Sequence, residues 1–173
     1  MKTENSFKAG MYLLETLTSG MYNDPLSIYR EYIQNSVDSI DTCSSITNKS
    51  VSITLDPFTK SITILDNGSG IPVKNAVSIL SGIGSSNKAG TDLRGFRGIG
   101  RLGGIAFSDK VSFRTKAVND NAEIIQKWDC IKLRKLLANP KNSSMHLNEL
   151  FNEITTFEKS KSVDINKSYF EVK

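Results

Sequence analysis

Polar and apolar residues between positions 25 and 40 follow the three- and four-residue spacing of an amphipathic helix. Asp24 is a suitable N-cap for this helix, and Pro25 is a suitable first helical residue because it lacks a backbone N–H. The core-facing stripe predicted from this spacing is Tyr29, Ile33, Val37 and Ile40. The opposite face is predicted to carry Glu31, Asn35 and Asp38, which follow one another at i, i+4 and i+7.

The rest of the chain is predicted to combine strands with short helices. Residues 51–55 and 62–65 have the β-branched pattern of two strands, and the Asp56-Pro57 pair between them predicts a turn. The other predicted elements are helices at 7–17, 73–80, 100–107, 131–137 and 147–151 and strands at 111–115, 123–128 and 169–172. Residues 81–97 are rich in Gly, Ser, Asn and Lys without apolar periodicity, which is typical of a mobile loop.

The polar face of the first long helix carries a carboxylate, an amide and a second carboxylate. Such a row is suited to holding a metal ion and a water molecule. On an amphipathic helix, however, a row of this kind is usually a solvated face. The row gains meaning only from the two blocks that follow it along the chain.

Two glycine-containing blocks follow the helix. Asp66-Asn67-Gly68-Ser69-Gly70 comes directly after a predicted strand, and Gly95-Phe96-Arg97-Gly98-Ile99-Gly100 opens a later apolar segment. As isolated motifs they are also compatible with a turn and a flexible linker. Gly98-x-Gly100-x-x-Gly103 matches the dinucleotide fingerprint, but no strand is predicted before it, as that motif requires. No Walker-type loop is present.

In this order and at these spacings, the three blocks resemble the GHKL ATPases, the superfamily of gyrase, histidine kinases, ninety-kilodalton heat-shock chaperones and MutL-type repair proteins. The resemblance covers roughly residues 7 to 116. It is nearest to the chaperone branch, because Tyr22-Asn23-Asp24-Pro25 precedes an Arg-Glu-x-x-x-Asn-x-x-Asp pattern. The resemblance implies the Bergerat fold: an α+β two-layer sandwich of a mixed, mainly antiparallel sheet with helices on one face. The predicted strand hairpin supports this fold independently.

The resemblance also assigns roles to the helix residues. Glu31 matches the general base, which orients or deprotonates the water that attacks the γ-phosphate. Asn35 matches the residue that binds Mg²⁺ through its side-chain oxygen, and a single protein ligand is reasonable for an ion that also takes phosphate and water oxygens. Asp38 matches a further acidic position of secondary importance.

The two glycine blocks would bind the nucleotide itself. In the resembling family, the aspartate at Asp66 accepts a hydrogen bond from the adenine amino group, and glycines allow the backbone to pass close to the base. Backbone amides of the later glycine block, residues 95–100, would attract phosphate at a helix start, and Arg97 and Arg101 would add positive charge. Lys88 would meet a phosphate when a lid over residues 81–100 closes. The implied nucleotide-binding residues are Asn35, Asp38, Asp66, Gly68, Gly70, Lys88, Gly95, Arg97, Gly98, Ile99 and Gly100.

One position departs from the family pattern. Family members usually carry a Gly-Thr pair at the entry to a late strand, with the threonine near the adenine. The comparable entry here is Asn166-Lys167-Ser168-Tyr169. Ser168 could supply the missing hydroxyl, but its register relative to Asp66 is open.

Composition sets broad limits. A chain of 173 residues with 38% hydrophobic and 23% charged residues suits one globular domain. Two cysteines and one histidine give no metal-ligand spacing. The net charge of +4 suits an anionic ligand. The first residues lack the apolar core of a signal peptide, and no apolar run reaches the roughly 18 residues of a membrane span, so a cytoplasmic setting is expected.

The sequence therefore predicts a Mg²⁺-dependent domain that binds and hydrolyses ATP, releases ADP and acts as a chaperone-like switch with a nucleotide-gated lid. Residues 1–173 would form the amino-terminal part of a larger protein with an unidentified downstream domain or client. A nucleotide-dependent homodimer is compatible with the resemblance, no membrane partner is expected, and nucleic acid is compatible with the charge. Two alternatives remain: a nucleotide-sensing interaction module without turnover, and the ATPase domain of a MutL-like or microrchidia-like nucleic-acid-processing protein.

Overall fold

The computed structural model describes residues 9–18, 24–44, 47–84, 99–161 and 164–173. Its six strands form one sheet in the order β1-β2-β6-β3-β4-β5, and every pairing between them is antiparallel. The strands are β1 (Val51–Asp56), β2 (Ser61–Asp66), β3 (Lys110–Lys116), β4 (Ala122–Asp129), β5 (Thr155–Lys161) and β6 (Tyr169–Val172).

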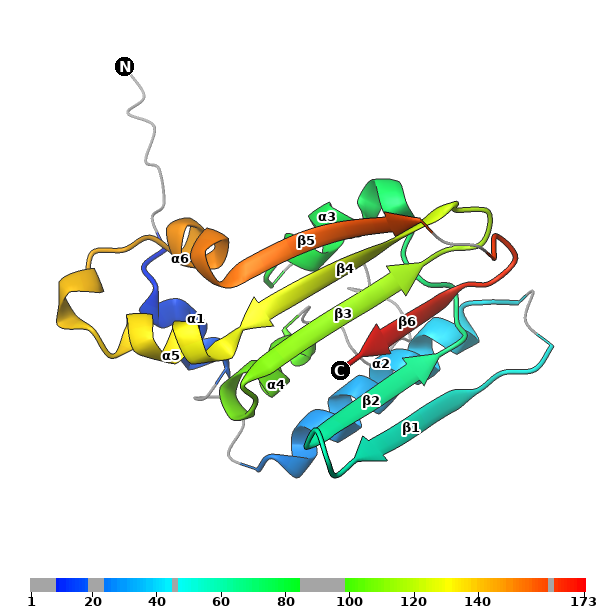
Figure 1. The fold of residues 1–173 in the computed structure, drawn as a ribbon, viewed down its shortest axis with the longest axis horizontal. Coiled ribbons are helices and arrows are strands. Elements are labelled where there is room, and N and C mark those ends of the chain that lie inside the picture. The colour runs from blue at the N-terminus through cyan, green and yellow to red at the C-terminus, as the bar shows by residue number, and fades with distance from the viewer. Residues whose placement is uncertain (1–8, 19–23, 45–46, 85–98, 162–163) are drawn as a thin grey trace, which may run out of the picture.

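The helices lie on one face and at one end of the sheet. Figure 1 shows α2, α3 and α4 together behind the strands, while α1, α5 and α6 gather beyond the start of β5. The helical segments are α1 (Tyr12–Thr18), α2 (Leu26–Asp41), α3 (Val73–Ser81), η1 (Gly100–Leu102), α4 (Gly103–Phe107), α5 (Cys130–Leu137), η2 (Pro140–Asn142) and α6 (Leu147–Ile154). This arrangement confirms the predicted α+β two-layer sandwich. No helix within the described ranges is long and apolar enough to cross a membrane.

Aromatic side chains join the sheet to both groups of helices. Phe113 of β3 is fully buried, and its ring lies 6.3 Å from Tyr32 of α2 and 6.1 Å from Phe170 of β6, measured between ring centroids. Trp128 of β4 meets Phe151 of α6 edge-on at 5.2 Å. The core is therefore continuous from α2, across the central strands, to α6.

The last strand in the sequence occupies a central place in the sheet. β6 lies between β2 and β3, with Phe170 opposite both Asp66 and Thr115. This long-range pairing settles the register that the sequence left open, because it brings Ser168 to the end of β2 where Asp66 lies. The loop before β6 is held by Lys116, whose buried ammonium group donates to the carbonyl oxygens of Asp164 and Lys167.

Most predicted elements are present, with shifted ends, and two observed elements, η2 and β5, were not predicted. Helix α2 begins one residue after Pro25, although the Asp24 carboxylate still accepts from the Leu26 N–H at 2.9 Å. Helix α1 begins at Tyr12, and residues 7 and 8 of the predicted first helix lie outside the described ranges. Strand β5 was not predicted. It is an edge strand whose side chains are mainly polar and exposed, so the sequence lacks the apolar alternation of a buried strand.

The predicted core stripe of α2 was wrong in part. The buried residues of this helix are Ile28, Tyr32, Ser36, Asp38 and Ile40, whereas Tyr29, Ile33 and Val37 are only half-buried. The helix packs against both β2 and η1, so its buried surface is wider than one apolar stripe and includes polar positions. Asp38 is consequently part of the buried surface, and Glu31 and Asn35 border it instead of lying opposite to it.

Replacement of Phe113 tests the importance of this aromatic core. We expect Phe113→Ala to lower the free energy of unfolding by about 3–5 kcal/mol, because it removes a fully buried ring and leaves a cavity. Phe58→Ala is the matched control, since Phe58 is 96% exposed and its loss should change stability by less than about 0.5 kcal/mol. Urea unfolding followed by circular dichroism measures both, and equal effects of the two changes would contradict the proposed packing.

Candidate functional site

Glu31 of α2 lies directly against Gly100, the first residue of η1. A Cβ built on Gly100 would lie 2.3 Å from the Glu31 Oε2 atom, closer than real Cβ atoms come to any neighbour. Any side chain at position 100 would therefore displace the carboxylate or the backbone. The structure thus brings Glu31, from the polar face of the first long helix, into contact with Gly100, the last glycine of the block at residues 95–100.

Asp66 ends β2 as a carboxylate that is only 1% exposed. Its Oδ1 atom accepts from the Gly68 N–H at 2.9 Å, while Oδ2 has no hydrogen-bond partner among the described residues. Burial raises the pKa of Asp66, and the Gly68 N–H and the nearby hydroxyls of Ser36 and Ser39 oppose this rise. A buried acceptor without a partner is rare in proteins and is suited to a ligand that brings a donor.

The two glycines after Asp66 are required by packing. A Cβ on Gly68 would lie 2.2 Å from the Ser39 hydroxyl oxygen of α2. Gly70 has a φ of +61°, and its Cβ would lie 1.9 Å from the carbonyl oxygen of Lys116 on β3. The turn between β2 and α3 therefore fits between α2 and β3 only because both residues lack side chains.

Two hydroxyl groups hold this turn in place. Ser168 is buried, and its hydroxyl donates to the Gly68 carbonyl oxygen at 2.7 Å. The hydroxyl of Thr115 accepts from the Ile71 N–H at 2.8 Å and donates to the Tyr169 carbonyl oxygen at 3.1 Å. Sequence reasoning named Ser168 but missed Thr115, because a threonine within a strand carries no motif and acts here through the neighbouring strand.

The other polar residues of α2 differ in exposure. Asn35 and Glu31 are half-buried, which leaves them accessible at the edge of the site. Asp38 is 4% exposed and its Oδ1 atom accepts from the Gln34 side-chain amide at 3.3 Å, so it is not part of a solvated face. Within the described ranges no three His, Cys, Asp or Glu residues form a metal-binding cluster. An amide oxygen such as that of Asn35 is a chemically suitable ligand for a hard cation such as Mg²⁺, which commonly takes few protein ligands.

The guanidinium group of Arg101 is bonded to backbone carbonyl oxygens, which does not fit its predicted role of adding charge near a phosphate. One terminal nitrogen of its guanidinium group donates to the carbonyl oxygens of Leu80 and Gly82, at the end of α3. The Gln126 side-chain amide donates to the same Leu80 oxygen at 3.2 Å. Burial lowers the pKa of Arg101. Its side chain therefore ties η1 to the end of α3.

Part of the predicted site lies outside the described residues. These positions are Lys88, Gly95, Arg97 and Gly98. Of the second glycine block, Ile99 and Gly100 are described: the Ile99 carbonyl oxygen accepts from the Leu102 N–H at 2.9 Å and closes the η1 turn. Of the predicted lid, Ser81 is the last residue of α3, and Gly84 follows with a φ of +74°.

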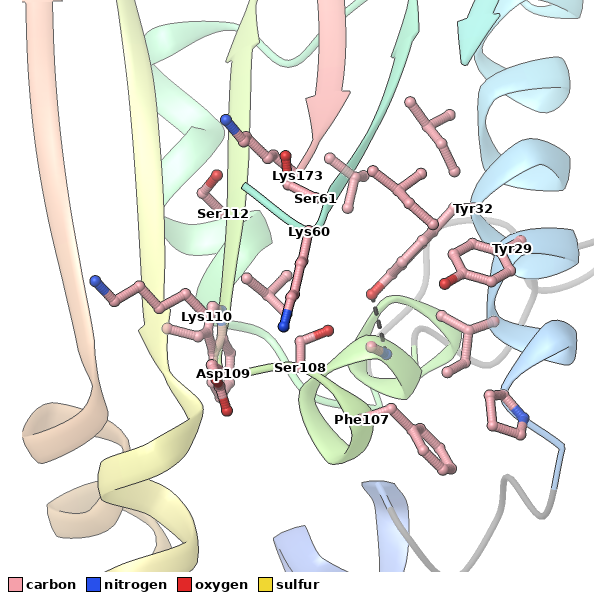
Figure 2. A pocket seen from close by; sticks show the side chains of 18 of the residues that line it. Tyr29, Tyr32, Lys60, Ser61, Phe107, Ser108, Asp109, Lys110, Ser112 and Lys173 are labelled. Atoms are coloured by element: carbon pink, nitrogen blue, oxygen red, sulfur yellow. Dashed lines mark hydrogen bonds between the residues drawn. The ribbon is translucent and has the colours of Figure 1, made fainter. Parts of the chain in front are cut away.

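A separate cavity of about 830 Å³ opens at the other end of β2. Figure 2 shows Tyr29 and Tyr32 of α2 on one wall, with Lys60 from the turn before β2, Ser61 from the start of β2 and Lys110 from the start of β3 on the others. Because β2 runs from Ser61 to Asp66, this cavity and the Asp66 carboxylate lie at opposite ends of the strand. The cavity is therefore not the site that the sequence motifs predict.

The antiparallel sheet with helices on one face is the fold of a GHKL-type ATP-binding domain. Comparison with known proteins gives the same class. Residues 26–161 match the family described as "Histidine kinase-, DNA gyrase B-, and HSP90-like ATPase", and the chain belongs to this family.

One curated protein and one solved structure are similar to this chain. The chaperone protein HtpG of Acinetobacter baylyi is 28% identical over 151 residues, which are 73% of this chain and 24% of HtpG. The chain thus spans about a quarter of the length of that relative. The crystal structure of the ATPase region of Saccharomyces cerevisiae topoisomerase II superposes with a TM-score of 0.58 and 19% identity, over 84% of this chain and 36% of that one. At 19% identity, the likeness to the topoisomerase II region concerns the fold alone.

The buried charge of Asp66 gives a pH-dependent prediction. Because its pKa is raised in the folded protein, the ionised form opposes folding at neutral pH. We expect Asp66→Asn, which keeps an oxygen for the Gly68 N–H, to raise the free energy of unfolding at about pH 7. This gain should disappear as the pH falls through the folded-state pKa of Asp66 and the parent carboxyl becomes protonated.

Asp56→Asn is the control of opposite sign. Hydrogen bonds, first of all from the Thr59 side chain, lower the pKa of Asp56, so its carboxylate favours folding above the unfolded-state pKa. Its replacement should therefore reduce stability at neutral pH and have less effect in acid. Urea unfolding of both variants across this pH range makes the measurement. A loss of stability in Asp66→Asn at neutral pH would show that burial of the charge is not the dominant effect.

Proposed function

We propose that this chain is a Mg²⁺-dependent domain that binds and hydrolyses ATP and acts as a chaperone-like, nucleotide-gated switch. Two observations on the same helix-facing side of the sheet carry the proposal: the Glu31 carboxylate lies against Gly100, and one carboxylate oxygen of buried Asp66 has no partner among the described residues. The first feature suits chemistry at a phosphate and the second suits recognition of a base. Membership of the ATPase family supports both.

Adenine recognition is assigned to the end of β2. The Oδ2 atom of Asp66, which has no partner among the described residues, would accept a hydrogen bond from the adenine amino group and so offset part of the cost of burying the carboxylate. Ser168 and Thr115 would keep the turn from Gly68 to Ile71 in the shape that receives the base. Ser168 would also take the place of the threonine that the resembling family carries.

The phosphates are assigned to the other glycine block. Backbone amides at Ile99 and Gly100, together with Gly95, Arg97 and Gly98, would face them, and Lys88 would contact the γ-phosphate from the lid. Asn35 would hold Mg²⁺ through its side-chain oxygen, with Asp38 in support behind it. The bound ion would supply neutralisation of phosphate charge.

Glu31 is assigned as general base. In hydrolysis a water oxygen forms a bond to the γ-phosphorus while the bond from that phosphorus to the bridging oxygen of ADP breaks. The Glu31 carboxylate would orient this water and take its proton. Contact with Gly100 keeps the carboxylate next to the glycine block, which is where the γ-phosphate would lie.

The switch is assigned to residues 81–100, closing over the nucleotide when the γ-phosphate is present. We propose further that residues 1–173 form the amino-terminal domain of a larger protein, in which nucleotide-dependent dimerisation favours closure. The length of HtpG, a chaperone of which this chain spans 24%, is consistent with additional domains. Because such domains commonly contribute charge at the γ-phosphate in the resembling family, slow turnover is expected from this chain alone.

Replacement of Glu31 separates binding from chemistry. We expect Glu31→Gln, which keeps the shape against Gly100, to bind MgATP about as well as the parent and to lose roughly 10²–10⁴-fold in hydrolysis rate. Calorimetric titration and phosphate release measure the two quantities, with Glu158→Gln on the exposed face of β5 as control. Undiminished hydrolysis would make Glu31 a structural acid, and a parent that binds without any turnover would favour a nucleotide-sensing module.

Replacement of Asp66 tests the adenine assignment separately. Asp66→Asn removes the charged acceptor and should weaken binding of ATP and ADP alike by about 1.5–3 kcal/mol. Asn35→Ala should instead weaken Mg²⁺-dependent binding more than binding of metal-free ADP. Titration of both variants with ADP, with and without Mg²⁺, distinguishes the two roles. If both variants bind like the parent, this nucleotide site is wrongly placed.

A further inference from the structure

We propose that the Tyr32 hydroxyl is a positioning group that holds the glycine turn, residues 100–104, against the helix that carries Glu31. The inference rests on the proposed function for its consequence, which is an effect on phosphate binding and hydrolysis. Its structural part stands on contacts that do not depend on a nucleotide. Tyr32 carries no motif, and sequence reasoning passed over it.

The Tyr32 hydroxyl makes two hydrogen bonds to the glycine turn. It donates to the Arg101 carbonyl oxygen at 3.0 Å and accepts from the Gly104 N–H at 3.1 Å. Figure 2 shows the tyrosine reaching from α2 to the backbone of α4, with the bond to the Gly104 nitrogen drawn as a dashed line. The side chain is 6% exposed, and its ring packs edge-on against Phe113. The hydroxyl therefore sits in a fixed place.

Two adjacent residues of α2 contact two glycines of the same turn. Glu31 lies against Gly100, and Tyr32 lies against Gly104, where a Cβ would come within 2.3 Å of the hydroxyl oxygen. A shift of the turn along α2 would break both contacts together. The hydroxyl that fixes Gly104 thereby also fixes the distance between Gly100 and the carboxylate of Glu31.

The hydroxyl also determines how the turn presents its amides. Inside the turn, the Gly100 carbonyl oxygen accepts from the Gly103 N–H, and the Ile99 carbonyl oxygen accepts from the Leu102 N–H. In a planar trans peptide the N–H points opposite to the C=O, so the Arg101 N–H points away from the interior of the turn. Tyr32 holds the carbonyl oxygen of the peptide between Arg101 and Leu102. It thereby limits rotation of the preceding peptide, between Gly100 and Arg101, and keeps the Arg101 N–H pointing outward.

A simple core role would not require this hydroxyl. The ring of Tyr32 already fills space against Phe113, and a phenylalanine would fill the same space without a polar atom. A buried hydroxyl that donates to one backbone group and accepts from another favours tyrosine, because its removal takes one hydrogen bond from each of the two groups. A core-filling role and a positioning role therefore predict different effects of the phenylalanine variant on phosphate binding.

Tyr32→Phe is therefore the decisive variant. We expect about a tenfold weaker affinity for a non-hydrolysable MgATP analogue, with unchanged affinity for adenosine, which lacks phosphates. The backbone amide of Gly104 should exchange its hydrogen faster, as NMR can measure without any nucleotide. Tyr29→Phe removes a hydroxyl from the same helix, at a half-buried position, and should change none of these quantities.

A second variant tests the contact from the side of the turn. Gly104→Ala places a methyl group against the Tyr32 hydroxyl and should weaken analogue binding in the parent. In the Tyr32→Phe background the 2.3 Å contact with the hydroxyl oxygen is removed and the nearest remaining atom is the ring Cζ at 3.2 Å, so the same change should cost several-fold less. This double-mutant cycle separates a direct contact from general destabilisation, which thermal unfolding of each variant monitors.

Several outcomes would overturn the inference. Equal weakening of adenosine and analogue binding would make Tyr32 a purely structural residue, and additive effects of the two changes would remove the direct contact. Unchanged Gly104 exchange and unchanged binding in Tyr32→Phe would leave the hydroxyl without a role. If the parent itself binds neither ligand, the proposed function fails, whereas the exchange of Gly104 still decides whether the hydroxyl holds the turn.

Discussion

The close approach of helix α2 to the glycine turn is the constraint on which the rest of the site depends. Glu31 and Tyr32 meet Gly100 and Gly104 so closely that a Cβ on either glycine would lie 2.3 Å from a side-chain oxygen and force that side chain to shift. This contact places the half-buried Glu31 carboxylate against a turn in which the carbonyl oxygens of Ile99 and Gly100 accept hydrogen bonds from within the turn. Because α2 also packs on β2, the same helix sets the distance from the glycine turn to Asp66. A single rigid element thus connects the two halves of the proposed nucleotide site.

Burial of Asp66 is the energetic counterpart of this arrangement. A carboxylate that is 1% exposed, with one oxygen unpartnered among the described residues, opposes folding when ionised. The surrounding structure tolerates it because Gly68, Ser36 and Ser39 offset part of the cost and because Ser168 fixes the adjoining turn. Such a local loss of stability is common where a group is kept ready for a ligand, and ligand binding would recover it.

Sequence patterns predicted most of the elements but not how they pack. The hairpin of β1 and β2 and the helix α2 have strong local periodicity and were found with small errors at their ends. Strand β5 was missed because its polar, exposed side chains follow no apolar alternation. The core face of α2 was misplaced because Ser36 and Asp38 are buried by contacts on two sides, and no single-helix pattern anticipates a second packing partner.

The sequence by itself determined the family, the order of the three motifs and the residue types that adenine and phosphate recognition would need. Those features are local, since Glu31, Asp66 and Gly100 each stand in a short recognisable block. Only the tertiary structure decided that Gly100 touches Glu31, that Ser168 reaches the Asp66 turn through β6, and that Tyr32 bonds to the glycine turn. Each of these contacts joins residues far apart along the chain, and their geometry follows from sheet register and helix packing, which local spacing does not encode.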